Sequence, residues 1–139
     1  MKSIDEIQDE IIAEFNACAD SFEKYEHLIG MAKDILPFTQ EARKVAAIVQ
    51  GCQSQVWIST ACRNGIFEFS GISQSAIANG TIALLERLFC NRRCEEVVNT
   101  KLRFIEETKF FDMFESERAK GIQHMIVMLQ EAAKEGVNQ

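Results

Sequence analysis

The spacing of apolar residues changes twice along this chain of 139 residues. It is helical at first, alternating in the middle, and helical again from Ser73 onward. Apolar residues three or four positions apart are typical of an amphipathic helix, whereas alternation is typical of a half-buried strand. A chain of this length can bury a real core within one domain. We therefore predict a single α+β domain over residues 1–139, with a small three-stranded antiparallel sheet covered by helices.

The alternating segment predicts the three strands, at residues 44–50, 55–62 and 66–71. Asn64-Gly65 separates the last two, and this dipeptide between alternating runs is the strongest short signal for a hairpin. The first two strands are then joined by a short polar turn.

The flanking segments predict helices with one apolar face each, and such helices need a surface to pack on. Ser3 and Glu6 can form a capping box at the first helix, and Pro37 ends the second, so we expect this pair to cover the sheet. The strand residue Trp57 and the aromatic cluster at 110–114 are expected in the core. Further helices are predicted from 76 to about 91, at 94–99, at 102–108, and from Ser116, which is expected to cap the last helix.

The turn between the first two strands contains Cys52, followed by the neutral, hydrogen-bonding residues Gln53, Ser54 and Gln55. Gly51 allows the backbone to turn sharply or to be approached closely. These neighbours give the turn little reason to be buried, so another protein can reach the sulfur. A cysteine is more often a buried and inert packing residue, and the residues alone leave both interpretations open.

Several segments together resemble the SufE/CsdE family of sulfur-acceptor proteins in iron–sulfur cluster assembly. Gly-Cys-Gln-Ser-Gln-Val-Trp at 51–57 resembles the family signature and is highly specific. The weaker segments are Glu23-Lys24-Tyr25, Leu28-Ile29, Leu36-Pro37, Ala76-Ile77-Ala78-Asn79-Gly80, and Arg118 and Gly121 followed by Ile122 and Met125. The resemblance runs from about residue 15 to residue 130. Gln74, Ser116 and Phe22 depart from it, at positions where the family often has an acid, a proline and a tryptophan.

The resemblance implies that Cys52 accepts sulfur as a persulfide from a pyridoxal-phosphate cysteine desulfurase of the SufS/CsdA type and thereby accelerates that enzyme. It implies delivery to a SufBCD-like iron–sulfur scaffold, and a fold shared with IscU-type scaffolds. The chain would be a stoichiometric carrier and activator, not an enzyme, without cofactor or metal. Arg118 would hold the Cys52 turn or favour a thiolate; alternatively, it is a surface arginine paired with Glu115 or Glu117.

Two other functions compete with this one. An IscU-like scaffold would need several convergent ligands, and Cys90 and Cys94, four positions apart, are a possible start. The other ligands would have to come from Cys18, Cys62, His27 or His124, which we otherwise interpret as packing or surface residues. A thiol enzyme would need a base or a resolving cysteine beside Cys52, and the sequence identifies neither.

Charge and hydropathy limit the partners and the cellular compartment that we expect. The net charge of −6 disfavours binding to nucleic acid, which needs a concentrated basic surface. No apolar run is long enough to cross a bilayer, and the N-terminus lacks the pattern of a signal peptide, so we expect a cytoplasmic protein with no membrane partner. In that reducing compartment, all five cysteines are expected to be thiols.

Overall fold

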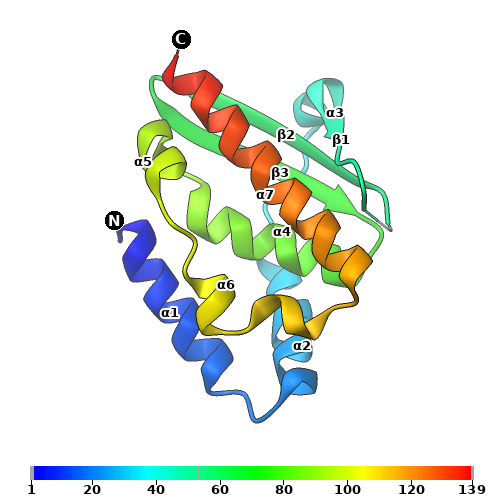
Figure 1. Ribbon diagram of the computed structural model, residues 1–139. Helices are drawn as coiled ribbons and strands as arrows, with labels where there is room; N and C mark the ends of the chain where they lie inside the picture. The colour runs from blue at the N-terminus through cyan, green and yellow to red at the C-terminus, as the bar shows by residue number, and fades with distance from the viewer. Residues whose placement is uncertain (1, 53, 139) are drawn as a thin grey trace.

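A four-stranded antiparallel sheet in the order β1-β2-β3-β4 forms one layer of the computed structural model, which describes residues 2–52 and 54–138 (Figure 1). The strands are β1 (Ala47–Ile48), β2 (Val56–Arg63), β3 (Ile66–Ser73) and β4 (Arg92–Arg93). The helices are α1 (Ile4–Asn16), α2 (Ser21–Gly30), η1 (Met31–Asp34), α3 (Gln40–Val45), α4 (Ala76–Phe89), α5 (Cys94–Asn99), α6 (Phe104–Glu107), η2 (Phe110–Met113) and α7 (Ser116–Val137), where η marks a 3₁₀-helix. The α+β architecture is as predicted, but the sheet has four strands, not three.

The hairpin of β2 and β3 is the centre of the sheet and follows from local chemistry. Asn64 and Gly65 adopt φ of 55° and 80°, the left-handed conformation that a tight hairpin turn requires, and Arg63 pairs with Ile66 across it. The predicted first strand is much shorter than expected. Thr39 accepts the backbone N–H of Ala42 and begins α3, so residues 40–45 are helical and only two residues pair with β2.

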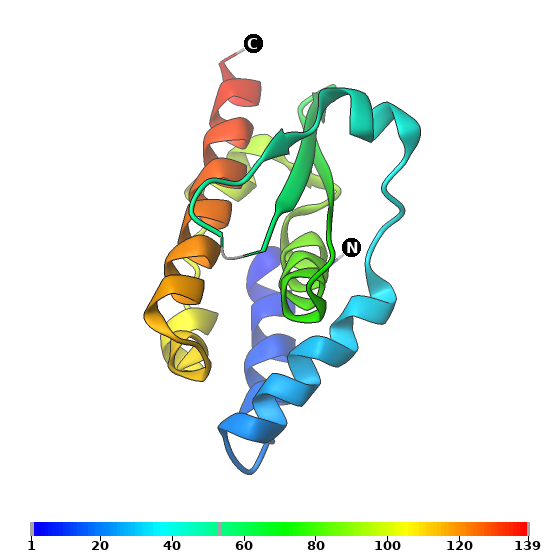
Figure 2. The same ribbon diagram turned by 90° about the vertical axis from the view of Figure 1, so that its right-hand side faces the viewer.

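Apart from α3, the helices lie on one side of the sheet, where they form two further layers. α4 packs on β3 and α7 crosses β2, while α1 and α2 lie behind α4 (Figure 2). The prediction that the first two helices cover the sheet directly is therefore wrong. At the crossing of α2 and α4, a Cβ on Gly80 would lie 2.2 Å from the Leu28 carbonyl oxygen, so only glycine permits this approach. α3 packs on the other face of the sheet.

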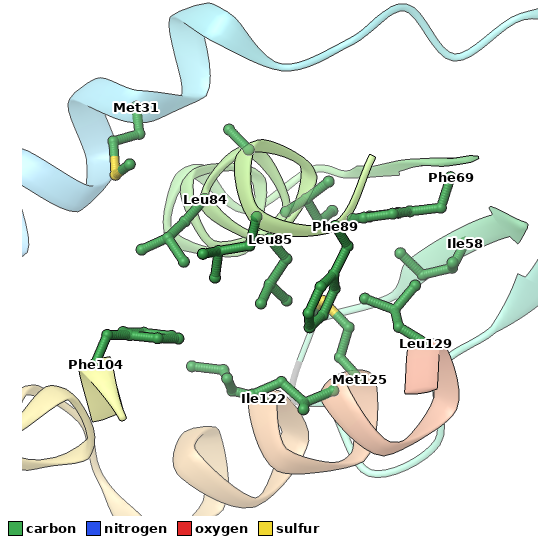
Figure 3. Packing of buried hydrophobic residues seen from close by; sticks show 14 of the residues in the cluster. Met31, Ile58, Phe69, Leu84, Leu85, Phe89, Phe104, Ile122, Met125 and Leu129 are labelled. Atoms are coloured by element: carbon green, nitrogen blue, oxygen red, sulfur yellow. The ribbon is translucent and has the colours of Figure 1, made fainter. Parts of the chain in front are cut away.

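The core lies between the sheet and the helices. Leu85 and Phe89 of α4 meet Ile122 and Leu129 of α7, with Phe104 at one side (Figure 3). The expected aromatic cluster is present: Phe110 is buried, and its ring centroid lies 5.3 Å from those of Phe104 and Phe114. Burial of these side chains supplies the main favourable term of folding.

Three residues lie in surroundings other than those predicted. Trp57 is only half-buried, because it lies on the outer face of the sheet with Phe38 and Ile72, where the segment containing α3 is the cover. The helical spacing of Phe22 with Tyr25 and Ile29 predicts one apolar face, but 68% of Phe22 is exposed. Ser116 is the first residue of α7 and not its cap, a position taken by Glu115.

The cysteines correct a further prediction, because Cys62 of β2 and Cys94 of α5 form a disulfide rather than remaining thiols. The pair lies against α7, where a Cβ on Gly136 would overlap Cys62. The two residues are 32 positions apart, so their pairing follows only from the folding of α5 beside the hairpin. Cys18, Cys52 and Cys90 are free. Within the described residues, no helix is both long and apolar enough to cross a membrane.

Candidate functional site

Cys52 precedes β2 in the chain and lies against Gly121 of α7. Gly51 has a φ of +84°, which favours glycine. On the helix, a Cβ on Gly121 would lie 3.1 Å from both the Cα and the Sγ of Cys52. The Cys52 Sγ lies 3.7 Å from the Gly121 carbonyl oxygen, which it faces as a weak donor. Gly51 and Gly121 therefore allow the turn and the helix to touch. The polar residues of the turn gave no indication of this contact.

A small cavity lies beside the Cys52 sulfur. Its volume of about 20 Å³ holds one water-sized group, and a single additional sulfur atom is of comparable size. Its lining is mainly apolar, with Ser54, Thr81 and Arg118 as the polar exceptions. The lining residues are Cys52, Ser54, Val56, Ile77, Ala78, Thr81, Arg118, Gly121, Ile122 and Met125.

Two effects act on the Cys52 thiol in opposite directions. Burial raises its pKa above the ordinary value, and the positive charge of Arg118 partly offsets this. Burial is the larger effect, so the resting residue is mainly the neutral thiol at neutral pH. A thiolate is the nucleophile in sulfur exchange, so full reactivity requires a more exposed position.

Arg118 and Cys52 are 66 positions apart in the sequence, and α7 brings them to the same cavity. The alternative of a surface ion pair finds no support, because Glu117 pairs with Lys120 and, among the described residues, Arg118 forms no ion pair. No hydrogen bond from Arg118 to the turn is present among those residues either. Arg118 therefore acts on Cys52 through its charge and its place in the cavity wall.

The other predicted turn residues have distinct positions. Ser54 lines the cavity, and Gln55 is exposed while its carbonyl oxygen accepts the hydroxyl of Ser73 at 2.8 Å. Asn79 in turn holds the backbone of Ser73 through both ends of its amide. Gln53 lies outside the described residues.

Sequence reasoning missed the roles of Ser73, Asn79 and His124 at this site. His124 Nδ1 lies 2.9 Å from the carbonyl oxygen of Gln50, directly before Gly51. An asparagine inside an otherwise apolar helical run was a signal for Asn79, whereas the sequence suggested His124 only as a possible metal ligand.

The remaining cysteines lie elsewhere and make other contacts. Cys90 donates to the Phe69 carbonyl oxygen, and burial raises its pKa to about 12, so it is an unreactive thiol. Cys94 is joined to Cys62 and is not available as a ligand beside Cys90. Across residues 2–52 and 54–138, no group of three or more His, Cys, Asp or Glu side chains converges as a metal site would require.

Comparison with known proteins places this site in a family. A family model described as SufE, Fe-S metabolism associated domain, matches residues 9–133. The chain belongs to the SufE family. In fold, this SufE-family protein is similar to the solution structure of a hypothetical protein from Thermus thermophilus, with a TM-score of 0.80 over 96% of this chain and 97% of that chain. The two sequences are 13% identical, so this likeness concerns the fold.

Proposed function

We propose that this protein accepts sulfur on Cys52 from a pyridoxal-phosphate cysteine desulfurase of the SufS/CsdA type and delivers it for iron–sulfur cluster assembly. Membership of a family associated with iron–sulfur metabolism supports the setting. The observation that carries the proposal is the position of Cys52, half-buried on a turn against α7 and beside a cavity of about 20 Å³. A carrier needs both a sulfur that a partner can reach and a shelter for the sulfur it has received.

The transfer needs no metal, cofactor or net oxidation. The Cys52 thiolate attacks the outer sulfur of the donor persulfide, the S–S bond of the donor breaks, and the donor cysteine leaves as a thiolate. A new S–S bond forms on Cys52, and the proton that Cys52 lost passes to solvent or to the departing thiolate. The acceptor on a SufBCD-like scaffold repeats this exchange in the next step.

The resting geometry explains why Cys52 would need the desulfurase in order to become reactive. Burial holds Cys52 as a thiol, and movement of the turn away from α7 exposes the sulfur and lowers its pKa towards the ordinary value. The nucleophile thus becomes active when the turn enters the desulfurase. Removal of the sulfur from the desulfurase frees that enzyme for another turnover, so the protein is a carrier and activator and not itself an enzyme.

The two alternatives have less support. The disulfide of Cys62 and Cys94 lies near Gly136, whereas Cys52 lies at Gly121 of the same helix. Fifteen helical residues separate these contacts by about 22 Å at 1.5 Å per residue. That separation places the disulfide too far from Cys52 to supply scaffold ligands or a resolving cysteine.

Mass spectrometry of the protein after incubation with a cysteine desulfurase and cysteine tests the proposal. The wild type should gain the mass of one sulfur atom, and a reducing agent should remove it. Cys52→Ser should gain nothing, because its hydroxyl is far less nucleophilic at neutral pH. Cys18→Ser, which removes a free cysteine distant in sequence from the turn, is the matched control and should gain sulfur like the wild type. Sulfur uptake by Cys52→Ser would refute the assignment.

A further inference from the structure

One face of α7 carries three residues that meet the turn of Cys52. Arg118, Gly121 and His124 are three positions apart and therefore lie in a row along the helix. Arg118 lines the same cavity as Cys52, and Gly121 lies against the Cα and Sγ of Cys52. His124 contacts Gln50 and Gly51, the two residues before Cys52. The row therefore follows the backbone of the turn. Arg118 and Gly121 line the cavity of Cys52, whereas His124 contacts the turn outside that cavity.

The contact of His124 has two components. Its Nδ1 lies 2.9 Å from the Gln50 carbonyl oxygen, and because a carbonyl only accepts, the Nδ1 must carry the hydrogen. The imidazole also occupies the space beside Gly51. A Cβ on Gly51 would lie 2.4 Å from His124 Nδ1 and 2.8 Å from its Cε1. The ring thus fits against a glycine that has no side chain to exclude it, and it bonds to the residue before that glycine.

The two ends of the turn are held differently. At the end near β2, the Gln55 carbonyl oxygen accepts from Ser73, which is only 6% exposed and is fastened by Asn79. At the other end, Gln50 and His124 are both exposed, so water can replace their hydrogen bond when it opens. The buried contact is suited to remain closed, and the exposed one is suited to open.

We propose that His124 is a positioning residue that holds the turn of Cys52 on α7 in the resting protein and releases it when the desulfurase docks. This inference rests on the proposed function and adds a residue to it. His124 acts through the backbone of Gln50 and Gly51, and it takes no part in the exchange of sulfur. A hydrogen bond of ordinary net strength changes the ratio of closed to open turn by about two- to ten-fold.

Alkylation of Cys52 by iodoacetamide measures that ratio without any desulfurase. His124→Leu puts an apolar side chain of similar bulk in place of the imidazole and removes the hydrogen bond, so it should accelerate alkylation about two- to ten-fold. His124→Asn can place an amide N–H near the position of Nδ1 and should restore most of the wild-type rate. Gln123→Ala changes the exposed neighbour on α7 and should leave the rate unchanged.

Cys90 provides an internal reference for folding in the same samples. Its thiol is partly buried and donates to the Phe69 carbonyl oxygen, far in sequence from the His124 contact, so its alkylation should have the same rate in all four proteins. If Cys52 in a folded His124→Leu is alkylated at the wild-type rate, the proposal is overturned. Equal acceleration in His124→Asn and His124→Leu would also overturn it, because the hydrogen bond would then not matter.

Sulfur uptake separates this proposal from the one on which it rests. As the concentration of acceptor is varied, His124→Leu should reach half-maximal uptake at a lower concentration, with an unchanged maximal rate. Its bound sulfur should also be lost faster to glutathione. If the wild type accepts no sulfur, the proposed function fails, while the alkylation rates still decide whether His124 holds the turn. If the wild type accepts sulfur and the alkylation rates do not differ, only the role of His124 is refuted.

Discussion

Glu86 is a buried acid in α4 whose titration should make the protein less stable as the pH rises. Only 5% of the residue is exposed, and burial raises the pKa of its carboxyl from 4.5 to about 7. One oxygen accepts the backbone N–H of Leu36 at 3.0 Å, and among the described residues the other has no partner. This environment suits a neutral carboxylic acid better than a carboxylate.

The sign of the effect follows from proton binding. Between pH 4.5 and about 7, the folded protein keeps the proton on Glu86 while the unfolded chain loses it. The folded state then binds more protons, so the free energy of unfolding falls as the pH rises through this window. A pKa raised from 4.5 to about 7 corresponds to a loss of about 3 kcal/mol above pH 7, and none below pH 4.5.

Glu86→Gln removes this titration and keeps an oxygen that can accept from Leu36. Urea denaturation over a range of pH should show nearly equal stability for variant and wild type near pH 4.5, and a variant more stable by up to about 3 kcal/mol above pH 7. Glu41→Gln, an exposed change in α3, is the control and should show no such trend. A difference between Glu86→Gln and wild type that is constant across this range would refute the reasoning.

Two further predictions concern α7 and the disulfide. Gly121→Ala places a Cβ 3.1 Å from the Cys52 Sγ, so it should push the turn outward and speed alkylation of Cys52. Alanine also favours the helix by about 1 kcal/mol, so the denaturation midpoint should not fall, and unchanged alkylation would contradict the contact. Cys62→Ser should lower stability without reductant by about 3–4 kcal/mol, from closure of a loop spanning a sequence separation of 32. Thiol titration of the unfolded, unreduced wild type should find three thiols, Cys18, Cys52 and Cys90, and a count of five would show that the disulfide does not form.

Features that depend on neighbouring residues were predicted well. The capping box of Ser3 and Glu6 is present, and the hairpin turn lies at Asn64-Gly65. Helix α5 occupies the predicted residues 94–99. In each case, the residues that form the structure are within a few positions of one another, so their side chains and backbone preferences act without help from the rest of the fold.

Most of the predictions that failed concern structure decided by distant partners. The exception is the apolar, β-branched run at 45–49, which favoured a full strand although the nearby Thr39 caps a helix that runs to Val45. Arg92 and Arg93 form a strand only because β3 offers them an edge, so no local pattern indicated it. Trp57 alternates correctly with its neighbours, yet alternation does not say which face of a sheet receives the larger cover.

The sequence by itself determined the α+β class, the central hairpin and the place of Cys52 on a polar turn, because periodicity and turn chemistry act over short distances. The resemblance also marked Arg118 as a possible support for the Cys52 turn, and the structure shows both residues lining one cavity. Only the tertiary structure brought Gly121 and His124 to the turn, through the crossing of α7 over β2. It likewise decided the burial of Glu86 and the pairing of Cys62 with Cys94. These contacts join residues far apart in the chain, and they exist only when whole elements pack with one particular face and register.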